Sequence, residues 1–160
     1  SVLPALIRKL ILKSGAINNS QNEGREVILM SAREQETYLE LSCDLSELEK
    51  IKECIFGLSV DNGIKKKIFL ACDEIFANIT SYSGADWVQF GCVKNADKAV
   101  ITFTDNGTAF NPLESKVEKE FEDLALGGMG ISLVRELCSH INYSNIHGKN
   151  ILNLEFELEI

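Results

Sequence analysis

The strongest constraint on the fold of this chain is one apolar stretch that ends abruptly. Val100 to Thr104 consists only of β-branched and aromatic residues, and this composition predicts a strand that is buried on both faces. Asp105, Asn106 and Gly107 follow at once. They predict a turn, because Asn and Gly tolerate positive φ and a short carboxylate can bond its own backbone two residues on. The sequence therefore predicts a carboxylate at the end of an interior strand.

Two interpretations of this turn are open from the residues alone. The Asp105 carboxylate could accept a hydrogen bond from an exocyclic amine such as that of adenine, while Gly107 lets a flat ring lie close to the backbone. Alternatively, the same residues form only the corner of a hairpin, which is the interpretation that the Asp-x-Gly pattern by itself favours.

The composition indicates one soluble globular domain. The chain has 160 residues, of which 45% are hydrophobic and 25% charged, and no apolar run approaches the roughly 18 residues that cross a bilayer. The formal charge of −8 works against binding to nucleic acid or to an anionic membrane, since both reward clustered Lys and Arg. We therefore expect a protein or small-molecule partner, with no nucleic acid and no membrane.

The cysteines indicate a reducing compartment. They are odd in number, widely spaced and mostly set among apolar residues, so we expect reduced core thiols. No C-x-x-C pair exists, and His140 and His147 are too few to complete a zinc site with ordinary spacing. A cytoplasmic protein without a structural metal is expected. The cysteines are Cys43, Cys54, Cys72, Cys92 and Cys138.

The hydrophobic periodicity predicts three helices and five strands after residue 37. Ser46 and Glu49 have the spacing of a capping box at the start of the first helix, and Asp61 or Asn62 is expected to cap the second. The apolar stripe of the second helix comprises Ile64, Ile68, Ala71, Cys72, Ile75 and Ile79. The helices are expected at 44–57, 62–82 and 131–140, and the strands at 38–43, 87–93, 99–104, 141–146 and 151–158.

The first 36 residues are expected to form a separate part of the chain. Apolar residues at helical spacing predict an amphipathic helix over residues 4–13, and residues 14–25 are turn-forming throughout, as in a linker. The helix could belong to a longer protein, to an added expression sequence or to a dimer contact. Residues 37–160 are then the ordered domain.

The second helix carries a polar pair that suits catalysis. Glu74 and Asn78 are four residues apart, hence neighbours on the helix surface, and they lie on the flank of the apolar stripe. An Asn amide oxygen is a suitable hard ligand for Mg²⁺, and a carboxylate one turn away could orient or deprotonate an attacking hydroxyl. The alternative is an exposed polar pair without a function.

The third helix begins at a glycine cluster, Gly127-Gly128-Met129-Gly130. Free amides at a helix N-terminus form an anion site, because the unpaired N–H groups and the helix dipole both favour phosphate oxygens. Plain hinge glycines would explain the same residues. The charged segment before them, residues 113–123, lacks an apolar face and is predicted to be a mobile lid.

Together and in this order, the three motifs resemble the Bergerat-fold ATP-binding superfamily of gyrase, histidine kinases and heat-shock chaperones. Within this superfamily the sequence is most similar to the small bacterial anti-sigma factor serine kinases. In these kinases Asp-x-Gly is followed by Phe-x-Pro, and Gly-Gly-x-Gly is followed by an apolar helix. The resemblance covers residues 38–158. The matching residues are Asp105, Gly107, Phe110, Pro112, Gly127, Gly128, Gly130 and Leu133.

The resemblance implies an α+β fold, a two-layer α/β sandwich with a mixed, mainly antiparallel sheet and helices on one face. ATP would lie between the helical layer and the lid. Glu74 would be the general base, Asn78 would hold Mg²⁺, and Asp105 would read adenine. The remaining nucleotide-binding residues would be Gly107, Phe110, Gly127, Gly128, Met129 and Gly130.

The resemblance also implies a substrate, namely a serine or threonine of a small anti-sigma factor antagonist, whose phosphorylation frees the kinase to hold a sigma factor. Such kinases often carry a basic residue beside the glycine box, which is absent here unless Lys116 or Lys119 of the lid replaces it. Ser139 stands where the family often has Asp. Two alternatives remain. One is a nucleotide-binding regulatory module without efficient phosphoryl transfer, and the other is a histidine-kinase catalytic domain.

Overall fold

The computed structural model describes residues 34–114 and 128–158. The chain divides into two compact units, Ser1–Ser31 and Ala32–Ile160, and the described residues all belong to the second. The predicted helix over residues 4–13, its linker and most of the predicted lid lie outside the described residues. The proposed boundary between residues 36 and 37 therefore stays a prediction.

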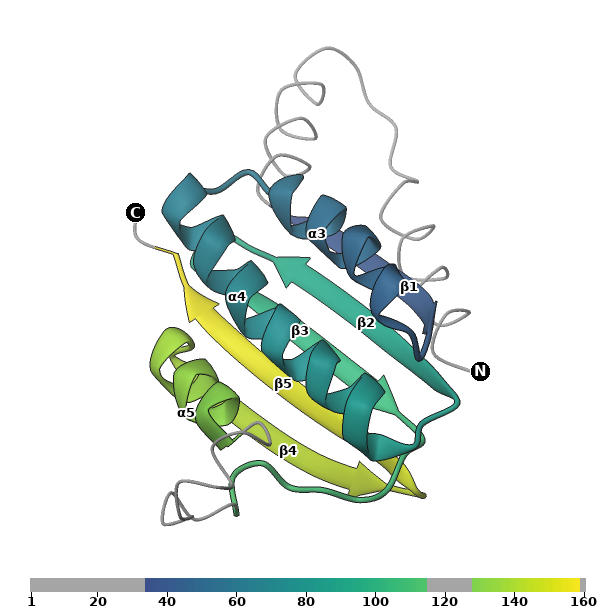
Figure 1. Ribbon diagram of the computed structural model, residues 1–160. Coiled ribbons are helices and arrows are strands. Elements are labelled where there is room, and N and C mark those ends of the chain that lie inside the picture. Colours follow the sequence, from purple (N-terminus) through teal and green to yellow (C-terminus); the bar gives the residue numbers. More distant parts are fainter. Residues whose placement is uncertain (1–33, 115–127, 159–160) are drawn as a thin grey trace, which may run out of the picture. The chain divides into compact units, whose positions relative to one another are not determined.

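The described residues of the second unit form a five-stranded sheet with helices on one face (Figure 1). The strand order is β1-β2-β3-β5-β4, and every neighbouring pair is antiparallel. The fold class predicted from the motifs is confirmed, with described pairings that are wholly antiparallel rather than mixed. In chain order the elements are β1 Gln35–Ser42, the 3-10 turn η1 Leu45–Glu47, α3 Leu48–Phe56, α4 Asn62–Asn78, the π-helical turn η2 Ile79–Ser83, β2 Trp87–Lys94, β3 Lys98–Asp105, α5 Gly128–Leu137, β4 His140–Ile146 and β5 Lys149–Glu157.

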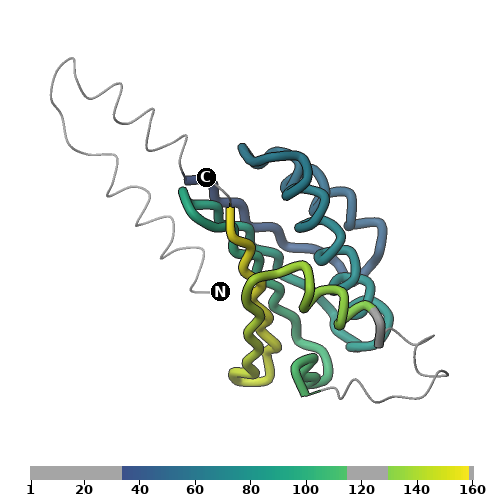
Figure 2. The backbone as a smooth tube through the Cα atoms, turned by 90° about the vertical axis from the view of Figure 1, so that its left-hand side faces the viewer, coloured from purple at the N-terminus to yellow at the C-terminus, as the bar shows by residue number. Residues whose placement is uncertain are grey.

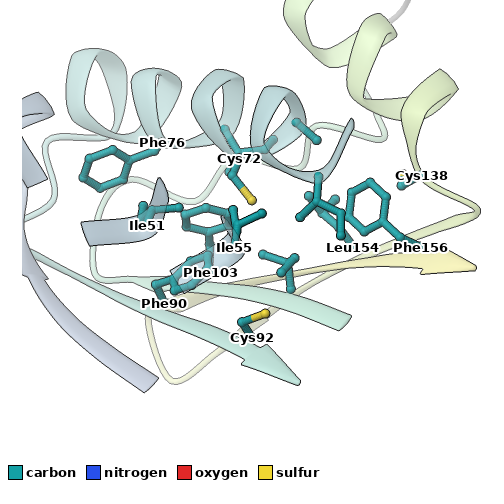
Figure 3. Close-up of a cluster of buried hydrophobic side chains, with 14 of the residues drawn as sticks. Ile51, Ile55, Cys72, Phe76, Phe90, Cys92, Phe103, Cys138, Leu154 and Phe156 are labelled. Carbon is teal, nitrogen blue, oxygen red and sulfur yellow. The ribbon is translucent and has the colours of Figure 1, made fainter. Parts of the chain in front are cut away.

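The side view in Figure 2 shows the helical layer on one face of the sheet, and the buried core side chains in Figure 3 lie between these two layers. Phe90 of β2 and Phe103 of β3 are almost fully buried and meet edge to face, with ring centroids 5.4 Å apart. Figure 3 shows these two rings lying beneath helix residues such as Ile55 and Cys72. Phe76, also fully buried, extends the stripe that periodicity predicted for the second helix.

The central strand β3 is buried on one face only, so the prediction of burial on both faces was wrong. Its residues alternate between buried and half-buried. Ile101 and Phe103 face the helices, whereas Thr102 and Thr104 lie on the opposite face, which α3, α4 and α5 do not cover. The outward-facing β-branched residues favour the strand conformation and pair with side chains of neighbouring strands, and they do not pack in the core.

Aspartates cap the 3-10 turn η1 and the helix α4. Asp61 accepts a hydrogen bond from Gly63 N at 2.7 Å, which confirms one of the two caps predicted for α4. At the preceding helix the predicted capping box was wrong, because Asp44 accepts from Ser46 N at 2.7 Å and opens the 3-10 turn before α3. The helical segment begins with the turn that Asp44 caps, two residues before the predicted cap Ser46.

All five cysteines are free and lie within the described residues, as predicted. Cys72, Cys92 and Cys138 are buried, and Cys43 and Cys54 are half-buried. Among the helices of the described residues, none combines the length and apolarity that a bilayer crossing requires.

Candidate functional site

The carboxylate of Asp105 is held in a fixed orientation at the end of β3. The residue is 4% exposed, and its Oδ1 accepts hydrogen bonds from Gly107 N at 2.8 Å and from Asn150 Nδ2 at 3.1 Å. No described residue donates to its other oxygen, Oδ2. Asp105 therefore keeps one acceptor for a ligand while the other holds the turn together.

Gly107 is required by close packing rather than by its backbone conformation. Positive φ occurs only at Gly84, His147 and Gly148 in the described ranges, so the expectation of positive φ in the Asp-Asn-Gly turn was wrong. A Cβ on Gly107 would lie 2.6 Å from the backbone oxygen of Ser83. Any side chain at this position would push the turn away from the end of the helical layer.

The π-helical turn η2 connects this turn to the polar end of α4. Thr108 N donates to Ser83 O at 2.8 Å, and Ser83 Oγ donates to Ile79 O at 2.6 Å. Asn78 is the last residue of α4 and directly precedes η2. Single π-helical turns occur often at functional sites, and this one fixes Asn78 relative to the Asp-x-Gly turn.

Glu74 and Asn78 lie on the flank of α4, as predicted. Both are half-buried, while Ile75 and Phe76 on the same helix are buried. Neither polar side chain makes a hydrogen bond or ion pair within residues 34–114 and 128–158. Both side chains are therefore available to a ligand or a substrate.

The start of α5 lies directly against Glu74. A Cβ on Gly130 would collide with the Glu74 carboxylate and would lie 3.2 Å from its Cδ. Gly128 and Met129 form the first turn of the same helix, so their amides lie at the helix N-terminus next to a carboxylate, while Gly127 lies outside the described residues. The structure therefore brings two of the predicted motifs, the Glu-x-x-x-Asn pair and the glycine box, into contact.

The segment after the Asp-x-Gly turn is held at Pro112. Its carbonyl oxygen accepts a hydrogen bond from Arg135 Nη2 of α5 at 2.8 Å. Phe110, predicted as part of the nucleotide site, is 59% exposed, so its role stays a prediction. Arg135 was missed by the sequence reasoning, although it is the one basic residue of α5 and in that respect was a visible signal.

Asn150 is the most consequential residue that sequence reasoning missed. It is 6% exposed, lies opposite Asp105 in the β3–β5 register and bonds its carboxylate. Its neighbours on the inward face of β5 are Leu152, Leu154 and Phe156. One amide at the start of such an alternation was the signal that could have identified it.

The thiol of Cys43 lies close to the same carboxylate. It donates to Ile79 O at 3.8 Å, and burial, together with the charges of Asp105, Asp86 and Asp44, raises its pKa. Cys43 therefore stays a neutral thiol at physiological pH and adds no charge to the region.

The chain belongs to the histidine kinase-like ATPase domain family, whose sequence profile matches residues 46–156. This match confirms the resemblance that the three motifs predicted, and it makes the chain an ATP-binding domain of the kinase-like type. Comparison with curated proteins finds no match.

The solved structures that share the fold include the following two. The RsbU and RsbW domains of Rv1364c from Mycobacterium tuberculosis align with a TM-score of 0.55 and 12% identity, over 78% of this chain and 32% of that one. The SiaB–SiaC complex from Pseudomonas aeruginosa aligns with a TM-score of 0.51 and 10% identity, over 88% of this chain and all of that one (100%). This chain thus spans about a third of the length of the first structure.

Proposed function

We propose that this domain is an ATP- and Mg²⁺-dependent protein serine/threonine kinase that phosphorylates a small antagonist protein. The single observation that carries the proposal is the contact between Gly130 and Glu74. It joins a helix N-terminus, which favours phosphate, to a carboxylate that can accept a proton from an incoming hydroxyl.

The residues around this contact fit a nucleotide. Asp105 Oδ2 would accept from the exocyclic amine of adenine, and Gly107 would hold the turn that presents this oxygen by packing closely against Ser83. The first amides of α5 would hold the phosphates. Phosphate groups and Asn78 would together hold Mg²⁺.

The donor set fits Mg²⁺ in particular. No cluster of three or more His, Cys, Asp or Glu residues occurs in the described part of the chain. Mg²⁺ keeps several waters and is commonly bound by one or two protein groups together with substrate phosphates, so a single Asn78 oxygen suffices.

The chain's own contribution to transfer would be positioning and charge compensation. Bound ATP supplies the phosphoryl group. Glu74 would take the proton of the substrate hydroxyl, and the positive end of the α5 dipole would offset the charge of the phosphate oxygens. The shielding of Glu74 by Gly130 would limit the water that reaches the proton acceptor.

The partner proposal is supported by the two structural neighbours. One contains an RsbW domain in the same chain as an RsbU domain, and the other is SiaB in complex with SiaC. We infer that this chain likewise works with a small protein partner, whose phosphorylation would release the kinase to hold a sigma factor. A homodimer and a cytoplasmic location, in keeping with five free thiols, belong to the same proposal.

A nucleotide-binding module without efficient transfer is the second candidate. The observation that favours it is that the one basic residue of α5, Arg135, bonds Pro112 O and so is engaged away from the phosphate site. A histidine-kinase catalytic domain is the third candidate, because the matching family is described by that name.

Single-turnover transfer from γ-labelled ATP to candidate antagonists tests the proposal. Glu74→Gln should keep ATP affinity, because the amide is nearly isosteric, and should lower transfer by about 10²–10⁴-fold. Asn78→Ala should instead lower Mg²⁺-dependent ATP affinity and transfer together. The exposed Glu53→Gln on α3 is the matched control. Equal transfer by parent and Glu74→Gln would refute the base assignment, and no transfer by the parent would favour the binding module.

A further inference from the structure

We propose that Asn150 is a positioning residue that sets the base specificity of this site through Asp105. The inference rests on the proposed function and concerns the part of the site that would read the nucleotide base. It assigns a role to the network formed by Asn150, Tyr143 and Asn145, none of which belongs to the three motifs.

The sheet places Asn150 between two strands that both contact it. It lies opposite Asp105 of β3 on one side and opposite Asn145 of β4 on the other. The side chain is buried, with 6% exposure, so its polar atoms must find partners within the protein.

The orientation of the Asn150 amide is dictated by its surroundings. Its Nδ2 lies 3.2 Å from Gly107 O and 3.0 Å from Thr108 O. Backbone carbonyls only accept hydrogen bonds, so the NH₂ group must face them and the opposite orientation is excluded. On the other side, Oδ1 accepts from Tyr143 Oη at 2.5 Å and from Asn145 Nδ2 at 3.0 Å.

The fixed NH₂ group also fixes the Asp105 carboxylate. Nδ2 lies 3.1 Å from Asp105 Oδ1, so its two hydrogens serve three acceptors and at least one hydrogen is shared. Because Gly107 N donates to the same Oδ1, that oxygen is saturated by the protein. The carboxylate cannot rotate without losing both bonds.

This arrangement leaves Oδ2 as a rigid acceptor toward the ligand. A rigid acceptor favours a base that presents a hydrogen-bond donor to Oδ2, such as the exocyclic amine of adenine. It disfavours a base that presents a carbonyl oxygen or only a hydrogen to the same atom. Loss of Asn150 would let the carboxylate turn and would weaken this preference without removing Asp105 itself.

The test compares ATP with purine riboside 5′-triphosphate, which lacks only the exocyclic amine, by calorimetric titration of the full chain. The parent should bind ATP about 10- to 100-fold more tightly, the range for leaving a buried acceptor unpaired. In Asn150→Leu this ratio should fall to less than about threefold. A merely structural role would weaken both nucleotides equally and leave the ratio at the parent value, which would overturn the inference.

Two further variants keep the test decisive if Asn150→Leu does not fold. Tyr143→Phe removes one of the two donors to Asn150 Oδ1 and should lower the ratio by about two- to fivefold; an unchanged ratio would count against the network. Asn153→Leu is the matched control, because Asn153 lies on the other face of β5 and accepts from Thr102 Oγ1 at 2.7 Å. Its ratio should equal that of the parent.

The outcome also separates this inference from the proposed function. A parent that binds both nucleotides equally, or neither, would refute the assignment of Asp105 to the base and the inference with it. If the parent and Asn150→Leu discriminate equally well between the two nucleotides, only the positioning role of Asn150 is refuted.

Discussion

Asp105 holds the turn through one carboxylate oxygen, and we propose that the other oxygen binds the nucleotide base. Asp105→Asn should weaken ATP binding by about 1–3 kcal/mol. Two donors, Gly107 N and Asn150 Nδ2, already face Oδ1. The oxygen of the new amide must stay on that side, so its NH₂ would face the amine of the base and repel it.

Isothermal titration calorimetry with ATP measures this loss. Asp97→Asn is the control, because Asp97 lies in the exposed turn between β2 and β3. Equal ATP affinity of the folded Asp105→Asn variant and the parent would place the nucleotide elsewhere.

Cys54 should be the most reactive thiol of the described residues. Its pKa is lowered to about 7, chiefly because the Cys92 thiol donates a hydrogen bond to it, with a smaller contribution from Thr37. Burial raises the pKa of Cys72 well above the ordinary value. Since the thiolate is the nucleophile, alkylation of Cys54 should rise as pH increases through about 7 and level off above it.

Iodoacetamide labelling followed by mass spectrometry at several pH values measures this profile. Cys54→Ser should remove the low-pH labelling, and Cys72 should stay unlabelled in the folded protein. A labelling midpoint near 9, the ordinary value for a thiol, would contradict the effect of Cys92.

At the scale of elements, the contact between α4 and α5 depends on the absence of one side chain. Gly130→Ala places a Cβ against the Glu74 carboxylate, so either the helices separate or Glu74 leaves its position. The colliding atom is the end of a flexible side chain, so Glu74 can turn aside and the loss of stability should be small. If Glu74 is the base, transfer should fall by more than about tenfold.

Urea denaturation and single-turnover transfer, measured on the same preparation, separate the two effects. A variant that loses stability but transfers at the parent rate would show that the contact is structural only. If both changes act through the same carboxylate, the double variant Glu74→Gln with Gly130→Ala should transfer no more slowly than Glu74→Gln alone.

The elements were largely predictable because their patterns are local. The apolar stripe of α4 and the alternation in β3 and β5 follow from the sequence over fewer than about 20 residues. The cap expected at Ser46 was wrong because Asp44 and Ser46 both suit a helix start, and Asp44 caps the 3-10 turn before α3. The positive φ expected around Gly107 was wrong for another reason. The glycine is required by its contact with Ser83, which is distant in sequence, and no local pattern reports that contact.

The motif residues of the proposed site could be named from the sequence, and the residues that support them in the structure could not. Glu74, Asn78 and Asp105 stand out by residue type and spacing. Asn150 gains its role only from the register that pairs it with Asp105, 45 positions earlier. Such a register is set by the whole sheet and cannot be obtained from one strand.

At the scale of the whole molecule, nucleotide should act as a stabilising ligand. ATP with Mg²⁺ at 100 times its Kd should add about 2.7 kcal/mol to the free energy of unfolding. For a chain of this size the Tm should rise by about 5–10 °C. Differential scanning calorimetry measures the shift, and sodium triphosphate at the same concentration controls for binding of phosphate alone.

The Asp105→Asn variant should show a smaller shift at the same ATP concentration, since it binds less of the ligand. A Tm that does not respond to ATP in the parent would contradict nucleotide binding by the native state.

The pairing of β3 with β5 also has a consequence for the order in which the site can form on the ribosome. When Lys98–Asp105 emerges, one edge of this strand has its partner β2, but the other edge waits for Lys149–Glu157. Until then Asp105 lacks Asn150, and a central strand exposes an unpaired edge that favours aggregation. Nascent chains stalled between these two strands should therefore depend on chaperones, and nucleotide should help only after β5 has emerged.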